Sequence, residues 1–256
     1  MSAIVTILAV LWPVAVWAQL EFVPEESQPV VFAGKPQQVR VAIRNSTDKE
    51  ITTDASYRLF QLTAATAVPL DDAQPWKKLR VLTKQTIIEE LPVTLPAVRS
   101  ATRFRIDCAD IGRLTVTALP EDTLKRLREL AGDEPLGVFD PDNKLKPALK
   151  AAGVEFVDFE VEPRDCKLVI AWPTGRELPE SVLSRVKKGT AVVWFKSIRT
   201  PAAYAVRVEA GTVVVASPGT IAGLSDSALS QVNLIRYAEL ALTPDALQLP
   251  FDHQSQ

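Results

Sequence analysis

Residues 167–173 read Lys-Leu-Val-Ile-Ala-Trp-Pro, and this stretch decides how the second half of the chain folds. It is apolar from Leu168 to Trp172, and an unbroken apolar run of this length is typical of a strand buried on both faces of a parallel sheet. Residues 191–195, Ala-Val-Val-Trp-Phe, form a second run of the same kind. Further strands are predicted at 136–140 and 154–159, and a hairpin is predicted over 204–216.

Amphipathic helices are predicted between these strands. The first is capped by Asp142 or Asn143, the last by Ser225 or Asp226, and another lies between them. Strands that alternate with helices predict a doubly wound, mostly parallel α/β domain over 135–245.

The first half of the chain has a different periodicity. In residues 37–45, the apolar Val39, Val41 and Ile43 alternate with polar side chains, which predicts a strand with one buried face. Similar short strands, predicted at 56–62, 86–95, 102–107 and 113–117, indicate an antiparallel β-sandwich over 19–119. The sequence Phe-Ala-Gly-Lys-Pro at 32–36, followed by the strand that ends in Asn45, resembles the opening of immunoglobulin-like modules in secreted carbohydrate-active proteins.

A helix is predicted to link the two domains over 120–134. Leu124, Leu127 and Leu130 recur at helical spacing, and Gly132 is placed to end the helix.

The N-terminus has the features of an export signal. Residues 1–18 are apolar and uncharged, and the run is too short and too interrupted by Pro13 to cross a bilayer. Val16 and Ala18 are small residues at a signal-peptidase site, so cleavage before Gln19 is predicted, with an uncleaved N-terminal anchor as the alternative. This predicts a periplasmic or secreted bacterial protein with no stable membrane span after cleavage. Residues 246–256 are predicted to form a disordered tail.

Composition narrows the range of partners. The chain has 29 basic and 31 acidic residues with both signs interspersed, so no basic stripe points to nucleic acid. We expect a protein or polysaccharide partner of the cell envelope. The two cysteines, Cys108 and Cys166, fit no zinc motif and are predicted to be separate buried thiols, although an oxidising compartment would allow them to pair.

Histidine-based catalysis has little support in this sequence. The single histidine, His253, lies in the polar C-terminal tail, and a catalytic triad needs an imidazole held beside its nucleophile. The chain has no phosphate-binding glycine loop. No cofactor, metal or catalytic residue is therefore predicted.

Ligand binding is predicted instead where strands end. Asp140, Asp142 and Asn143 follow the strand at 136–140, and Thr174 and Ser217 follow later strands. In open α/β sheets, ligands bind outside the carboxyl ends of the strands, so these side chains are candidates to bind a cation or a sugar. The alternative for the first three is helix capping with turn formation, and for Ser217 an ordinary loop.

Four phrases of the second half resemble one known family. They are Gly-Val-Phe-Asp-Pro at 137–141, Leu-Val-Ile-Ala at 168–171, Gly-Thr-Ala-Val-Val-Trp-Phe at 189–195, and Gly-Thr-Val-Val-Val at 211–215. They are similar to class I glutamine amidotransferase-like domains, particularly to the non-catalytic members found in secreted multidomain bacterial proteins. The resemblance implies a flavodoxin-like or amidotransferase-like sheet.

Catalytic members of that family carry a cysteine at a strand-to-helix elbow, with a histidine and a glutamate later. Here the elbow at 172–175 reads Trp-Pro-Thr-Gly, and Cys166 precedes its strand. The resemblance therefore implies a domain without glutaminase activity.

Two functions follow from these observations. The first is an exported, non-catalytic binding or structural module of a cell-envelope assembly. The alternative is a carboxylate-dependent hydrolase acting on glycans, with Asp140 and Asp142 as its acids. Two carboxyl groups facing each other across an open cleft, about 5 to 9 Å apart, would favour the hydrolase, whereas buried or capping carboxylates would not.

Overall fold

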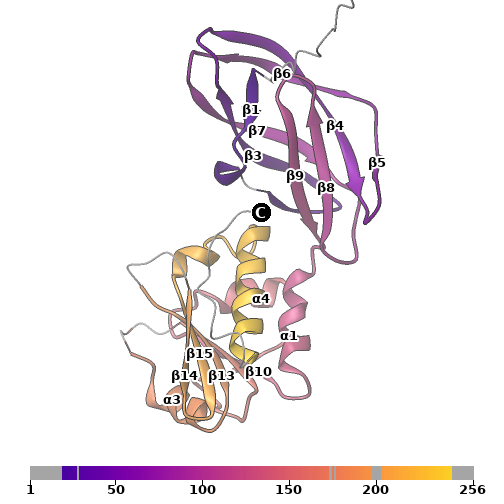
Figure 1. Cartoon of the computed structure of the whole chain (residues 1–256). Helices are drawn as coiled ribbons and strands as arrows, with labels where there is room; N and C mark the ends of the chain where they lie inside the picture. Colours follow the sequence, from indigo (N-terminus) through magenta and orange to yellow (C-terminus); the bar gives the residue numbers. More distant parts are fainter. Residues whose placement is uncertain (1–18, 28, 173–174, 176, 198–202, 244–256) are drawn as a thin grey trace, which may run out of the picture. The chain divides into compact units, whose positions relative to one another are not determined.

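A computed structural model describes residues 19–27, 29–172, 175, 177–197 and 203–243 (Figure 1). The signal peptide predicted for 1–18, the candidate Thr174 and the tail predicted for 246–256 lie outside these residues. The described residues are 41% strand and 21% helix and contain several mixed sheets, so the expectation of a mixed, sheet-rich α/β protein is confirmed.

The described residues divide into two compact units. The first comprises 19–27, 40–91 and 105–115, and the second comprises 29–39, 92–104 and the described part of 116–243. The domain limits expected at 119, 134 and 245 stay predictions.

Strands before residue 120 belong to two sheets, with orders β1-β3-β7 and β2-β9-β8-β4-β5, and β6 also pairs with β4. Their bounds are β1 Leu20–Phe22, β2 Val30–Phe32, β3 Pro36–Asn45, β4 Ile51–Leu62, β5 Ala67–Pro69, β6 Gln74–Val81, β7 Thr86–Thr94, β8 Thr102–Cys108 and β9 Gly112–Leu119. β2 pairs with β9 in parallel, so the expectation of purely antiparallel sheets is wrong at this edge.

The strand β3 shows why these segments form sheets. Val39, Val41 and Ile43 are fully buried while Arg40 and Arg44 are exposed, as the alternation predicts. Strand β6 was not predicted, because Pro75 interrupts its pattern. The structure places Pro75 opposite Ser56, where the pairing of β4 with β6 shifts register, and proline is tolerated at such an irregularity.

The third sheet has the order β11-β10-β12-β13-β15-β14. Its pairs are parallel except for the edge strand β14, which runs antiparallel to β15 and forms the predicted hairpin. Strand β11 is much shorter than the predicted 154–159. The bounds are β10 Leu136–Phe139, β11 Val157–Asp158, β12 Leu168–Ala171, β13 Ala191–Phe195, β14 Tyr204–Val208 and β15 Gly211–Ala216.

Helices cover both faces of this sheet, because its central strands are apolar on both sides. The bounds are α1 Arg126–Ala131, α2 Lys146–Ala151, α3 Glu180–Lys187 and α4 Ala228–Leu242. Side chains of α1, α2 and α4 share one apolar cluster with Ile170 and Val193, and those of α3 share another with Val169 and Val192. Figure 1 shows α1 and α4 beside each other over the sheet.

Two local expectations change. The segment predicted as a linker contributes Leu124 and Leu127, both fully buried, to the cluster beneath α4. The cap of α4 is Ser227, not Ser225 or Asp226, because its side chain accepts a hydrogen bond from the backbone N–H of Ser230 at 3.2 Å. Among the described residues, no helix combines the length and apolar character needed to cross a membrane.

Gly211 provides a test of the packing at the start of β15. A Cβ atom there would meet the backbone carbonyl oxygens of Val186 and Thr190, the latter at 2.6 Å. We expect Gly211→Ala to lower the free energy of unfolding by roughly 3 kcal/mol, because backbone atoms cannot move aside as a side chain would. Urea denaturation would measure it. Gly219→Ala is the control, since its nearest contact is Ser217 Oγ at 3.8 Å, and equal losses in both variants would contradict the close approach.

Candidate functional site

The carboxyl edge of the third sheet, where its parallel strands end, brings several predicted positions together. From β10 the chain passes to β11 on one side and then to β12 on the other, so the strand order reverses beside β10. Such a switch point is where open α/β sheets bind ligands. Asp140 follows β10 and Ser217 follows β15, so both lie along this edge.

The carboxylate of Asp140 is fully buried and both of its oxygens accept hydrogen bonds. Oδ1 accepts from the backbone N–H of Lys144 at 2.9 Å, and Oδ2 accepts from Leu145 and Lys146 at 2.7 and 2.9 Å. These donors are the first residue of α2 and the two residues that lead into it, and N–H groups at the start of a helix lack partners within the helix. Asp140 therefore caps α2, and the prediction of a cap at Asp142 or Asn143 is wrong.

The conformation of Asn143 explains this difference. Its φ of 53° is left-handed, a conformation that asparagine tolerates, and its N–H donates to the carbonyl of Asp140 at 3.1 Å. The chain therefore turns back, and the next three N–H groups reach the carboxylate that precedes the turn.

A charge cluster, formed by Asp140, Lys146, Asp158 and Glu160, surrounds this cap. The Lys146 side chain is only 8% exposed, and its Nζ lies 2.8 Å from Asp158 Oδ2 and 2.9 Å from Glu160 Oε1. Glu160 Oε1 also accepts from the backbone N–H of Asp140 at 2.6 Å. The cluster thus joins the end of β10, the first turn of α2 and the chain beyond β11.

The ionisation of Lys146 and Asp158 follows from their contact. Burial by itself would lower the pKa of the Lys146 ammonium, but hydrogen bonds to Asp158 and Glu160 outweigh it and raise that pKa. Burial would raise the pKa of Asp158, but the Lys146 ammonium outweighs it and lowers that pKa. Both groups are therefore charged at neutral pH. Sequence reasoning missed this pair, because the only local signal is a lysine in the first turn of a helix.

The other predicted ligands are less enclosed. Asp142 and Asn143 are exposed in the turn after β10, while Ser217 is half-buried. The Ser217 carbonyl accepts from the backbone N–H and the hydroxyl of Thr220 at 3.0 and 2.6 Å, which starts a short 3₁₀ turn. Ligand binding at these positions stays a prediction. Within the described residues, no group of three or more histidine, cysteine, aspartate or glutamate side chains is placed to hold a metal ion.

Aromatic side chains lie at the same edge: Trp172 follows β12, and Trp194 and Phe195 are the last residues of β13. The rings of Trp172 and Phe195 lie 5.6 Å apart, and both pack against the apolar cluster beneath α4. On the other face, Lys196 Nζ lies 4.5 Å from the centre of the Trp194 ring. Trp194 Nε1 is buried with no hydrogen-bond partner among the described residues. Trp172 and Trp194 are thus mainly core residues, as their apolar strands predict.

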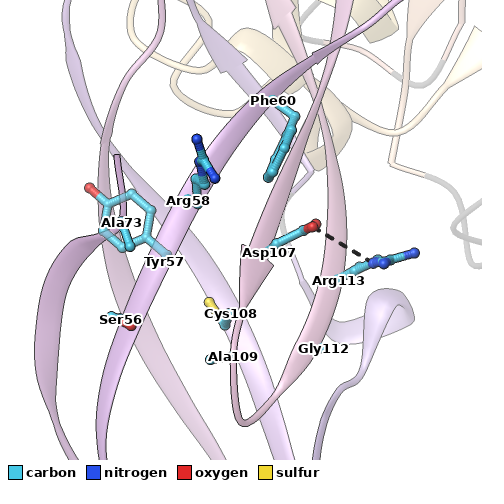
Figure 2. Close-up of a pocket in the computed structure, with 10 residues that line it drawn as sticks. All are labelled: Ser56, Tyr57, Arg58, Phe60, Ala73, Asp107, Cys108, Ala109, Gly112 and Arg113. Atoms are coloured by element: carbon cyan, nitrogen blue, oxygen red, sulfur yellow. Dashed lines mark ion pairs between the residues drawn. The ribbon is translucent and has the colours of Figure 1, made fainter. Parts of the chain in front are cut away.

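A second feature, which sequence reasoning did not predict, is a pocket of about 380 Å³ formed by β4, β8 and β9 (Figure 2). We call it the arginine pocket, because Arg58 of β4 and Arg113 of β9 line it together with Phe60 and Asp107. No motif in the sequence marks it, since its side chains come from strands about fifty residues apart.

Cys108 lines this pocket as a neutral thiol. Both cysteines of the chain are buried and free. Burial, followed by the neighbouring Asp107 carboxylate, raises the pKa of the Cys108 thiol to about 12. Burial also raises the pKa of Cys166. Neither side chain is therefore a thiolate nucleophile at neutral pH.

Asp140→Asn tests the cap. An asparagine has one acceptor oxygen and an NH₂ group that would face a backbone donor, so a buried N–H loses its partner. We expect the free energy of unfolding to fall by roughly 2 kcal/mol, measured by urea denaturation. Asp142→Asn, on the exposed side of the same turn, should change it by less than about 0.5 kcal/mol. Equal effects of the two variants would argue against the buried cap.

Ionisation of the Cys108 thiol should make the free energy of unfolding depend on pH in the alkaline range. The unfolded thiol ionises near pH 9.0, whereas the folded thiol keeps its proton to about pH 12. The protonated thiol therefore makes its full contribution to the free energy of unfolding below pH 9. That contribution is lost as the pH rises above 9, by up to about 1.4 kcal/mol per pH unit. Urea unfolding at pH 9 and pH 11 should show a larger loss for the wild type than for Cys108→Ala. Equal losses in the wild type and in Cys108→Ala would show that the Cys108 thiol ionises at the same pH in the folded and the unfolded protein.

Comparison with known proteins identifies no family. No protein-family model matches the chain, and no curated protein matches it. A β-glucosidase from Listeria innocua is 15% identical over 40% of this chain and 16% of that one, with a TM-score of 0.27. An alkylpurine DNA glycosylase from Pseudomonas fluorescens is 5% identical over 40% and 31%, with a TM-score of 0.29. A cycloisomaltooligosaccharide glucanotransferase from Paenibacillus sp. is 13% identical over 69% and 27%, with a TM-score of 0.31. The chain spans less than a third of each of these proteins, and likenesses this weak assign it neither fold nor function.

Proposed function

We propose that this protein is an exported, non-catalytic module that binds a polysaccharide or protein partner in a bacterial cell-envelope assembly. One observation carries the proposal: the Asp140 carboxylate is fully buried and accepts three backbone hydrogen bonds. By its position, Asp140 is the best candidate for a catalytic acid at the carboxyl edge. Its carboxylate instead stabilises the turn into α2.

The same observation weakens the hydrolase alternative. Glycoside hydrolysis needs two carboxyl groups that flank the scissile bond in an open cleft. Asp140 has neither an exposed oxygen nor a free one, which leaves Asp142 without the partner that the alternative requires. The exposed Asp142 and Asn143 and the half-buried Ser217 suit a contact surface better than a catalytic pair.

The finer fold assignment is part of the proposal. An immunoglobulin-like sandwich over 19–119 is supported by the burial of Val39, Val41 and Ile43 in β3 and by mainly antiparallel pairing of its strands. A flavodoxin-like or amidotransferase-like domain over 135–245 is supported by parallel strands whose order reverses at β10. The position of Cys166 before β12, and the burial that raises its pKa, support a non-catalytic member of the latter class.

Export and location rest on the first eighteen residues, which lie outside the described part of the chain. If they direct export, the mature chain begins near Gln19 and works in the periplasm or outside the cell. The interspersed surface charges support a partner other than nucleic acid.

Incubation of the purified chain with cell-envelope polysaccharides tests the proposal. We expect the polysaccharide to retain the chain in a co-sedimentation assay, while mass spectrometry detects no released oligosaccharide. Asp142→Asn serves as the test variant and Asp72→Asn, also exposed, as its matched control. Oligosaccharide release that Asp142→Asn abolishes and Asp72→Asn does not would overturn the proposal in favour of the hydrolase.

A further inference from the structure

Strand β14 is one edge of the third sheet. It extends from Tyr204 to Val208 and pairs with β15 along one side, and no other strand of the described residues pairs with its second side. The outer N–H and C=O groups of an edge strand are a template on which another strand can pair. Proteins usually prevent this with short edge strands, prolines, bulges or charged side chains.

The strand β14 lacks the protection that the other sheet edges have. The edge strands β1, β2, β5 and β11 contain only two or three residues each. The longer β7 contains Pro92 and two glutamates, and β6 contains Pro75 and three basic side chains. By contrast, β14 has five residues, no proline and a single charged side chain, Arg207. Among the described edges, it is therefore the one most suited to pair with another strand.

Apolar side chains of β14 lie on the face of the sheet that α3 covers. In β15, Val213 and Val215 pack in the apolar cluster of α3. Residues directly opposite each other in an antiparallel pair share a face, which places their partners Val206 and Tyr204 on the same side. The helix leaves both partly uncovered, since Tyr204 is 47% and Val206 is 42% exposed. Exposed apolar side chains thus lie beside an open backbone edge.

A second copy of β14 fits this edge in one register. When a two-fold axis perpendicular to the sheet relates two antiparallel strands, the residue on the axis pairs with itself and its neighbours pair symmetrically about it. Arg207 on the axis would place two guanidinium groups directly opposite each other, which is unfavourable. Ala205 on the axis would pair only three residues of the strand. Val206 on the axis pairs all five residues.

This register suits the side chains on both faces of the sheet. On the α3 face, Tyr204 lies opposite Val208 of the second copy and the two Val206 side chains meet, so exposed apolar surface is removed from water. On the other face, Arg207 lies opposite Ala205, whose short side chain leaves the exposed guanidinium group free to extend into solvent. No charge is buried, and none is placed directly opposite a like charge.

We propose that the protein forms a homodimer in which β14 of two copies pairs antiparallel about Val206, joining two six-stranded sheets into one continuous sheet. The contact involves five strand residues from each copy, so we expect a weak dimer with a dissociation constant on the order of 10 µM. The inference goes beyond the proposed function and is independent of it, because it uses no residue that the proposed function invokes.

Sedimentation velocity of the purified full chain, from about 1 to 200 µM, tests the dimer. We expect mainly monomer at the lowest concentration and mainly dimer at the highest. Val206→Lys should weaken association at least about tenfold, because two ammonium groups would meet at the axis. Val68→Lys is the matched control, since Val68 is an exposed valine of the edge strand β5, and it should leave association unchanged. Thermal unfolding would confirm that both variants fold.

Cysteine crosslinking tests the register. Directly opposed Cα atoms of antiparallel strands lie about 4.5 to 5.5 Å apart, which a disulfide can span. We therefore expect Val206→Cys to form a disulfide-linked dimer under mild oxidation, detected by non-reducing electrophoresis. Arg207→Cys is the control, because the residue opposite it is Ala205 rather than a second Arg207. The native Cys108 and Cys166 are buried, and the wild type measures their background.

Three results would overturn the inference. The first is a monomer at every concentration, and the second is association that Val206→Lys and Val68→Lys change equally. The third is crosslinking of Arg207→Cys as readily as Val206→Cys. If Val206→Lys unfolds at a lower temperature than the wild type, the two cysteine variants decide, because they place no charge on the axis. Retention by polysaccharide tests the proposed function separately, so either can fail while the other stands.

Discussion

The carboxylate of Asp140 accepts three backbone hydrogen bonds at the point where the order of the parallel strands reverses, and the carboxyl edge depends on it. A buried carboxylate is costly unless hydrogen bonds satisfy it, and the first turn of α2 has free N–H groups that need an acceptor. The N–H groups therefore satisfy the buried carboxylate, and the carboxylate satisfies the N–H groups. Lys146 and Glu160 extend the arrangement, because one is in that turn and the other accepts from the N–H of Asp140.

The protein uses its charges in two contrasting ways. In the charge cluster, the Lys146 ammonium is almost completely buried and engaged by two carboxylates, so its interactions hold the fold together. In the arginine pocket, Arg105 donates two hydrogen bonds to the Asp107 carboxylate, and the mostly exposed Arg113 lies 3.7 Å from the same carboxylate. Removing one partner of the buried pair would leave an uncompensated charge and would be costly, whereas the exposed pair is weakened by solvent.

Close approaches at two glycines contribute to the packing of the third sheet. Strands apolar on both faces require helices on both sides, and helices pack closely only where side chains leave room. Gly137 lies against Val169 and Phe159, and Gly211 lies against the carbonyl oxygens of Val186 and Thr190. Gly137 thus leaves room for side chains of β12 and of the segment after β11, and Gly211 leaves room for the backbone of α3 and of the residue before β13.

The sequence by itself determined the strands and helices with clear periodicity. The alternation in 37–45 and the apolar run at 191–195 act over a few neighbouring residues, and they form β3 and β13 as predicted. The run at 167–173 forms the shorter strand β12, and the leucines at helical spacing lie in a 3₁₀ turn at Thr123–Lys125 followed by α1 rather than in one helix. Tertiary structure alone decided that Asp140 rather than Asp142 or Asn143 caps α2, because this depends on the left-handed turn at Asn143. It also decided the arginine pocket, which exists because strand pairing brings residues from β4, β8 and β9 together. Periodicity is a local property of the chain, whereas the partner of a charged side chain is set by which distant segments pack beside it.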